Sequence, residues 1–320
     1  MKSPVTLFLL ALLSATAFAA MADADEGMWT FDKLPLERLA ADHNFTPPPG
    51  WSDHLRNSAV RLAQGCSGSF VSSKGLVLSN HHCVRACLQG LSTPGHALIE
   101  LGFLAATAAD EKKCPDLEVD QLVDITHISG QIKAATAGHE GPAFRQAEGT
   151  AIATVEKRCT TGDSVRCEVV TLFHGGTYDL YKYRRYQDVR LVFAPEEDAA
   201  SFGDATTSDW PLHALDVSLV RAYENGNPID TRANHLSFAH SPAKVGDLVF
   251  VVGNPGETKR LSTVAQLELE RDVYLPIEMQ DYAELHGIIG EAVRENPGFA
   301  EQVNVIPLRL GLARPKQLKR

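Results

Sequence analysis

Two adjacent histidines, His81 and His82, stand at the end of GCSGSFVSSKGLVLSNHHC (residues 65–83), and imidazole is the side chain best suited to move protons near neutral pH. The runs GSFVS and GLVLSN are rich in Val, Leu and Phe and are separated by turn-forming residues, which predicts a β-hairpin that ends at the histidines. Cys66 precedes the first strand and Cys83 follows the second. In an oxidising compartment, a disulfide between them would clamp the hairpin beside the histidines.

A single carboxylate, Asp216, stands at the head of the apolar run LDVSLVRAY. A buried aspartate must accept hydrogen bonds or pair with a cation, and an imidazole is a natural partner. The hairpin resembles the one that carries the catalytic histidine of trypsin-like serine peptidases, where a cysteine before the first strand pairs with a cysteine directly after the histidine. This resemblance implies that His82 is the general base and that Asp216 fixes its tautomer and stabilises the imidazolium.

Other roles for these residues remain open. Asp216 could instead cap a backbone turn at the start of its strand, and His82 could be a core histidine or a zinc ligand with His81 and Cys83. Adjacent residues on an extended chain point to opposite faces, which argues against a metal ion shared by the two histidines. We therefore expect no metal ion and no organic cofactor.

The nucleophile for such a base is harder to find. Trypsin-like peptidases carry it in a Gly-x-Ser-Gly turn long after the aspartate, and no serine after Asp216 stands in such a turn. The similar string GCSGS contains Ser67, which lies inside the predicted hairpin and would be a strand residue. A hydrolase that uses Ser67 is one hypothesis. The serines after Asp216 are Ser218, Ser237, Ser241 and Ser262.

The first residues of the chain indicate its location, and its net charge indicates which partners are disfavoured. Residues 1–19 have one early positive charge, an apolar run and a final Ala-Phe-Ala, which is typical of a cleaved signal peptide. No second long apolar run follows, so we expect an exported, soluble protein with no membrane anchor. The chain has 30 basic and 40 acidic residues, and a net charge of −10 disfavours nucleic acid as a partner.

The six cysteines are an even number in a chain expected to be exported, which favours disulfides over free thiols. Many pairings are possible. Of the three pairs that we expect, only Cys66 with Cys83 depends on more than proximity in the sequence. The last pair spans CTTGDSVRC, whose centre resembles a hairpin loop. The expected pairs are Cys66 with Cys83, Cys87 with Cys114, and Cys159 with Cys167.

The elements that must position these residues are mainly strands. Apolar spacing predicts a short helix in residues 51–64, a β region that extends to about residue 252, and one helical patch near residues 132–158. After GNPGETKR (residues 253–260) the spacing becomes helical. The strand-like runs are SFVS, GLVLSN, DQLVDITHI, RCEVVTLF, DVRLVFA, LDVSLVRAY and DLVFVVG.

Several motifs together resemble the bacterial exported serine peptidases known as dipeptidyl-peptidase seven and eleven, and the likeness extends to about residue 295. The resemblance implies a trypsin-like double β-barrel, with a large helical domain inserted between the part that carries His and Asp and the part that carries Ser. Residues 20–257 would be the N-terminal part of the peptidase domain, and residues 258–320 the start of the helical domain. The motifs are ADEGMWTF, the histidine hairpin, HGGTYDLYKYRRYQDVRLVFAPE, the Asp216 strand and GNPGETKR.

The resemblance also implies a function. Members release dipeptides from the free N terminus of peptides, in the periplasm or at the cell surface of Gram-negative bacteria, often as homodimers. Carried over by motif, His82 would be the general base and Asp216 its orienting acid. We therefore expect peptides with a free N terminus as substrates, a homodimer as the full-length form, and backbone N–H groups that stabilise the oxyanion.

The sequence departs from the family pattern in two places. The family serine belongs to a Gly-Asn-Ser-Gly-Ser-type segment that this chain lacks, so we expect either a fragment of a longer protein or a truncated, non-catalytic exported protein that binds peptides. Members also place Asn and an aromatic residue before the aspartate to hold the substrate amino group, where this chain has Thr207 and Ser208. Trp210 is the candidate substrate contact, with simple core packing as its alternative.

Overall fold

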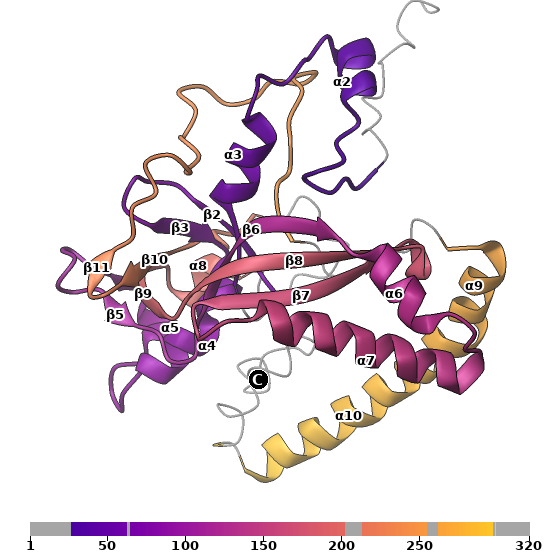
Figure 1. Cartoon of the computed structure of the whole chain (residues 1–320). Helices are drawn as coiled ribbons and strands as arrows, with labels where there is room; N and C mark the ends of the chain where they lie inside the picture. The colour runs from indigo at the N-terminus through magenta and orange to yellow at the C-terminus, as the bar shows by residue number, and fades with distance from the viewer. Residues whose placement is uncertain (1–26, 63–64, 202–212, 255–261, 297, 299–320) are drawn as a thin grey trace, which may run out of the picture.

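The computed structural model describes residues 27–62, 65–201, 213–254, 262–296 and 298. The described chain is mainly antiparallel β sheet with some helices, and its strands follow the order β4-β9-β10-β3-β2-β1-β6-β8-β7 (Figure 1). β11 pairs with β10, and β5 pairs with β9. The expected signal peptide and Trp210 lie outside the described residues.

The bounds of the elements are as follows. The strands are β1 (Ala59–Leu62), β2 (Ser67–Phe70), β3 (Leu76–Ser79), β4 (Phe103–Leu104), β5 (Lys112–Lys113), β6 (Val119–His127), β7 (Val165–Leu172), β8 (Thr177–Tyr186), β9 (Asp188–Ala194), β10 (Ser218–Glu224) and β11 (Asn227–Pro228). The helices are α2 (Leu36–His43), α3 (Trp51–Ser58), α4 (His81–Leu91), α5 (Leu98–Leu101), α6 (Ser129–Thr136), α7 (Gly141–Cys159), α8 (Glu197–Ala200), α9 (Val264–Leu269) and α10 (Leu275–Glu295), with a 3-10 turn at Phe173–Gly175.

β2 and β3 form the expected hairpin. Ser69 pairs with Leu78, and Phe70 pairs with Val77. Gly75 in the turn has a φ of +63°, which glycine adopts without strain. Phe70 and Val77 are fully buried, so the alternation of apolar residues sets which face of the hairpin packs on the core.

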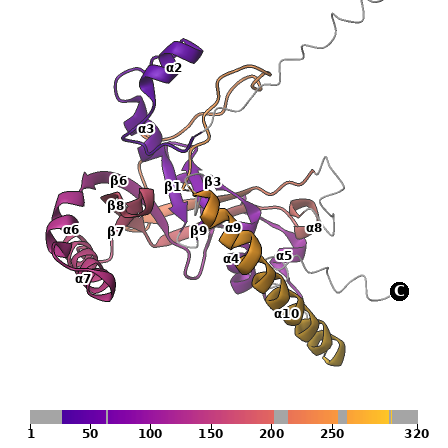
Figure 2. The same cartoon turned by 90° about the vertical axis from the view of Figure 1, so that its right-hand side faces the viewer.

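β6, β8 and β7 form a long ribbon at one end of the sheet, and α6 and α7 pack beside it (Figures 1 and 2). β6 pairs with β8 from Val119 to His127, so the ribbon is the most extended part of the sheet. Apolar side chains from the helices and the ribbon make a small core of their own. The buried members of this core are Ile128, Ile132, Val155 and Tyr178.

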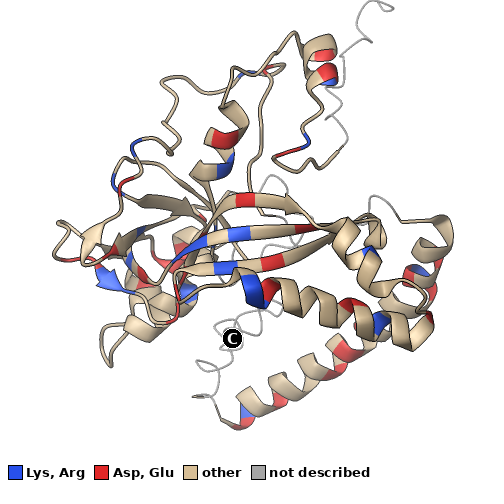
Figure 3. Ribbon diagram, viewed as in Figure 1, with Lys and Arg blue, Asp and Glu red and all other residues tan. Residues whose placement is uncertain are grey.

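Charged residues of both signs are interspersed along this ribbon (Figure 3). Asp120 of β6 is fully buried, and a buried charge is costly unless it is paired. Arginines of three different strands surround its carboxylate and so join these strands through one charge. They are Arg61 at 3.6 Å, Arg166 at 3.5 Å and Arg185 at 3.1 Å.

The three disulfides have the pairing expected from the sequence: Cys66–Cys83, Cys87–Cys114 and Cys159–Cys167. The first closes the β2–β3 hairpin, and the second joins α4 to the segment before β6. The sequence suggested a hairpin loop inside the third disulfide. This expectation is wrong, because the loop connects the end of α7 to β7.

The run DLVFVVG, residues 247–253, is not a strand in the structure, and this expectation is wrong. No described strand pairs with it, and Val249 and Val251 are 61% and 100% exposed. A strand needs a neighbour to satisfy its backbone N–H and C=O groups. The apolar pattern indicates that this segment is suited to strand pairing, but it does not indicate which strand would pair with it.

The chain is helical from Val264 to Glu295, as the spacing predicted. α9 continues through a π-helical segment (Glu270–Tyr274) into α10, and Thr263 begins the helix with a capping box. Figure 2 shows α9 near the middle of the view and α10 running from it to the lower right, with α6 and α7 at the left. Across the described residues, no helix combines the length and the apolar character needed to cross a membrane.

Replacing Cys87 and Cys114 together with alanine should lower the free energy of unfolding by about 3 to 4 kcal/mol, because the bond closes a long loop and restricts the unfolded chain. The two cysteines are separated by 27 positions, compared with 8 for Cys159 and Cys167. The matched control, in which that second pair is replaced, should therefore lose about 1 kcal/mol less. Urea denaturation of both variants measures the difference, and a larger loss in the control would contradict the argument.

Candidate active site

One strand pair brings His82 and Asp216 together. β10 lies antiparallel to β3, and Ser218 pairs with Ser79. The end of β3 therefore lies next to the beginning of β10, so two residues that are 134 positions apart become neighbours. Nδ1 of His82 lies 2.8 Å from Oδ2 of Asp216. The structure thus brings together the two residues that the sequence singled out.

The Asp216 carboxylate is held by several donors from the start of α4. Its Oδ1 accepts the backbone N–H of His82 at 3.1 Å, and its Oδ2 accepts the side-chain amide of Asn80 at 3.2 Å as well as the His82 ring. Because a carboxylate only accepts hydrogen bonds, Nδ1 of His82 carries the proton of this hydrogen bond. The N-terminus of α4 also favours a negative charge at this position.

Sequence reasoning missed Asn80. The side-chain amide of Asn80 also donates to the backbone oxygen of Asp216 at 3.0 Å, and the backbone carbonyl of Asn80 accepts the Ser218 hydroxyl at 2.7 Å. Asparagine is preferred directly before a helix, so the string SNHHC contained a signal for a helix start. The expectation that His81 and His82 lie on an extended chain is wrong, because α4 begins at His81.

The two histidines still have different surroundings. The side chain of His81 is 4% exposed, whereas that of His82 is 53% exposed. Burial lowers the pKa of His81, against the opposing influence of the Glu197 carboxylate. Nη1 of Arg85 lies 3.2 Å from Oε1 of Glu197. His82 is therefore the more accessible of the two histidines.

The histidine hairpin does not offer a thiolate for a metal ion. Potential ligand atoms of Cys66, His82 and Cys83 lie within 4.8 Å of one another. Both cysteines belong to one disulfide, however, and metal coordination needs the thiolate.

A second group of potential ligands consists of Asp32, His127 and Asp179. Nδ1 of His127 lies 2.6 Å from the buried carboxylate of Asp179, and Nζ of Lys33 lies 3.5 Å from the same carboxylate. The Lys33 ammonium group thus already forms an ion pair with Asp179. These contacts attach the segment around Asp32 to the ends of β6 and β8.

Ser67 lies in β2, and its hydroxyl oxygen accepts the backbone N–H of Asn254 at 2.7 Å. Gly253 packs so closely here that a β-carbon would lie 2.8 Å from the Ser67 oxygen. In the described part of the chain, the hydrogen bonds of His82 go to Asp216 and none goes to Ser67. The Ser67 hydroxyl therefore holds the start of GNPGETKR against the hairpin.

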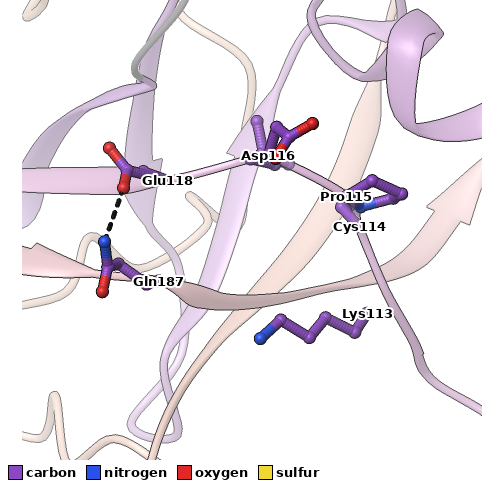
Figure 4. Close-up of a pocket in the computed structure, with 7 residues that line it drawn as sticks. Lys113, Cys114, Pro115, Asp116, Glu118 and Gln187 are labelled. Carbon is purple, nitrogen blue, oxygen red and sulfur yellow. Dashed lines mark hydrogen bonds between the residues drawn. The ribbon is translucent and has the colours of Figure 1, made fainter. Parts of the chain in front are cut away.

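A surface hollow of about 480 Å³ is lined by neither His82 nor Asp216. Figure 4 shows its residues, which come from the segment 113–118 and from Gln187, whose amide donates to Glu118 at 2.8 Å. Its cysteine, Cys114, is in a disulfide. The hollow contains no histidine, serine or free thiol, and so it offers no nucleophile with a base.

Residues 24–305 match the peptidase S46 family. The chain is 30% identical over 298 residues to the Asp/Glu-specific dipeptidyl-peptidase of Porphyromonas endodontalis, covering 84% of this chain and 41% of that protein. It is 30% identical over 282 residues to dipeptidyl-peptidase 7 of the same organism, covering 82% of this chain and 34% of that protein.

A crystal structure of Porphyromonas endodontalis DPP11 in complex with the dipeptide Arg-Glu matches with a TM-score of 0.70 and 25% identity, over 90% of this chain and 45% of that chain. The chain therefore spans less than half the length of these relatives.

Because burial lowers the pKa of His81, the unfolded chain takes up a proton more readily than the folded chain once the pH falls below about 6.5. The stability that depends on neutral His81 is complete above that pH and is lost as the pH falls towards the lowered pKa of the folded state. Replacing His81 with Gln should therefore reduce the loss of Tm between about pH 7 and about pH 5.

Thermal denaturation at the two pH values measures this loss. The exposed His96→Gln variant is the control, and it should lose as much stability as the wild type. A His81→Gln variant that loses as much as the wild type would contradict the assignment.

Proposed function

Because the chain belongs to the peptidase S46 family, we propose that it provides the histidine and the aspartate of a serine peptidase that releases dipeptides from the free N terminus of peptides. The observation that carries the proposal is the contact between His82 and Asp216. It joins a half-exposed base to a carboxylate that is 25% exposed. The relatives are named dipeptidyl-peptidases, which supports the choice of reaction.

In this proposal, Nε2 of His82 takes the proton of the serine hydroxyl as the oxygen attacks the scissile carbonyl, and then gives it to the leaving amine. Asp216 keeps the proton on Nδ1 and stabilises the imidazolium that forms. Backbone N–H groups stabilise the oxyanion. The serine would come from the part of the relatives' length that this sequence does not span.

We extend the proposal to the architecture. The sheet would be the first part of a trypsin-like double β-barrel, with residues 20–257 in the peptidase domain and residues 258–320 at the start of an inserted helical domain. Residues 1–19 would direct export to the periplasm or the cell surface. The complete protein would be a homodimer that takes peptides with a free N terminus, and Trp210 would contact them. The proposed reaction needs no metal ion or organic cofactor.

A second candidate is an exported protein that binds peptides without catalysis. It agrees with the first candidate in one respect: within the described ranges, no serine hydroxyl forms a hydrogen bond with His82. A hydrolase that uses Ser67 has less support, because that hydroxyl holds the backbone of Asn254.

In the complete protein that carries this sequence, His82→Ala should lower kcat for a dipeptidyl substrate by roughly 10⁴-fold and change KM little, because the base acts only in the chemical step. The matched control is His127→Ala, which removes another partly exposed histidine bonded to an aspartate. The control should keep kcat within about twofold of the wild type. A His82→Ala variant with a near-normal kcat would remove the basis of the proposal.

Treatment of the 320-residue chain with a fluorophosphonate probe should give no serine adduct, since the proposal places no activated serine in it. Mass spectrometry of the treated protein locates any adduct, with an active serine peptidase in the same reaction as the positive control. An adduct at Ser67 that disappears in His82→Ala would favour the hydrolase that uses Ser67 instead.

A further inference from the structure

A buried polar cluster beside His82 has no part in the proposed reaction. It consists of His81 and Arg85 on α4 and Glu197 on α8, with side chains 4%, 12% and 8% exposed. Oε1 of Glu197 lies 3.2 Å from Nη1 of Arg85, and Oε2 lies 3.9 Å from Nδ1 of His81. A buried ion pair is weak evidence for stabilisation, because desolvation offsets the attraction. Such a cluster therefore suggests a geometric role.

The cluster is connected to both members of the His82–Asp216 pair. On one side, His81 precedes His82 in the first turn of α4. On the other side, Glu197 begins α8, and the carbonyl of Ala199 in that helix accepts the backbone N–H of Leu215 at 2.8 Å. Leu215 directly precedes Asp216. The contacts thus form a closed ring through α4, Glu197, α8 and Asp216, back to His82.

The backbone around Glu197 is also fixed from outside the ring. Phe103 of β4 pairs with Ala194 of β9. Gly102, whose φ is +68°, packs so closely that a β-carbon there would lie 2.8 Å from the nitrogen of Glu196. Glu197 therefore projects from a rigid backbone towards α4, and this rigidity is what a positioning residue requires.

We propose that Glu197 is a positioning residue, which through its ion pair with Arg85 fixes the start of α4 and the Asp216 segment relative to each other, and so holds His82 in the tautomer that has its proton on Nδ1. The inference concerns the same pair as the proposed function and deepens it. It concerns the geometry around His82, and the tautomer of His82 can be measured without any catalytic activity.

The charges of the cluster agree with this role. Burial lowers the pKa of His81, which favours its neutral ring, and Arg85 remains as the cation that balances Glu197. The groups that influence the charge of His81 are Glu197, Asp216 and Arg85, with the backbone of Pro195. Removing the charge of Glu197 would leave Arg85 without its balancing carboxylate and would loosen the contact between α4 and α8.

The test is the tautomer of His82 in the 320-residue chain, measured by ¹⁵N NMR of labelled histidines at about pH 8.5, where ordinary imidazoles are neutral. The His82→Gln variant identifies the signals of His82. In Glu197→Gln we expect the ratio of the Nδ1–H to the Nε2–H tautomer to fall about tenfold, within the range of measured couplings in polar networks.

The matched control is Glu111→Gln, which removes the carboxylate partner of Arg221 from a similarly buried ion pair at 2.9 Å. It should leave the His82 tautomer unchanged. If Glu197→Gln does not fold, the same measurement on Glu197→Asp, which keeps the charge but reaches less far, decides the matter. A wild-type tautomer ratio in the folded Glu197 variant, or an equal change in the control, would overturn the proposal.

The measurement also separates this proposal from the proposed function. A shift of the tautomer with no loss of peptidase activity in the complete protein would support the positioning role of Glu197 and count against His82 as the base. A normal tautomer in a Glu197 variant, together with an inactive His82→Ala enzyme, would do the reverse.

Discussion

The antiparallel pairing of β3 with β10 is the constraint on which the candidate site depends. It runs from Ser79 opposite Ser218 to Leu76 opposite Arg221. Val77 and Val220, which face each other in this pair, are both fully inaccessible to solvent. A slip of one residue would turn these side chains to the other face of the sheet. The burial of the central strands therefore fixes the position of Asp216 relative to α4.

Local patterns in the sequence predicted part of this arrangement. The hairpin and the Cys66–Cys83 bond follow from short apolar runs with a turn between them, because both depend on residues within one stretch. His82 and Asp216 were found through the resemblance of their motifs to trypsin-like peptidases. These two residues are 134 positions apart, and their approach depends on strand pairing that no local periodicity encodes.

The contacts that sequence reasoning missed share one cause. Asn80, Ser218 and Glu197 act through hydrogen bonds and ion pairs to residues more than a hundred positions away. Their residue types are common on protein surfaces, and only the tertiary structure gives them partners. The run DLVFVVG failed as a predicted strand for a related reason, since a pattern shows which residues suit burial but not which segment covers them.

The precision of the His82–Asp216 pair must come from the framework around it. The His82 side chain is 53% exposed, and even a hydrogen bond to a charged group contributes only about 1.5 to 3 kcal/mol. That energy alone would allow other rotamers of an exposed ring to be populated. Three contacts restrict the two partners before they meet: the disulfide from Cys66 to Cys83 in the first turn of α4, the backbone N–H of His82 and the amide of Asn80. Little ordering entropy then remains to be lost when the pair forms, and so a single hydrogen bond is sufficient to orient the His82 ring.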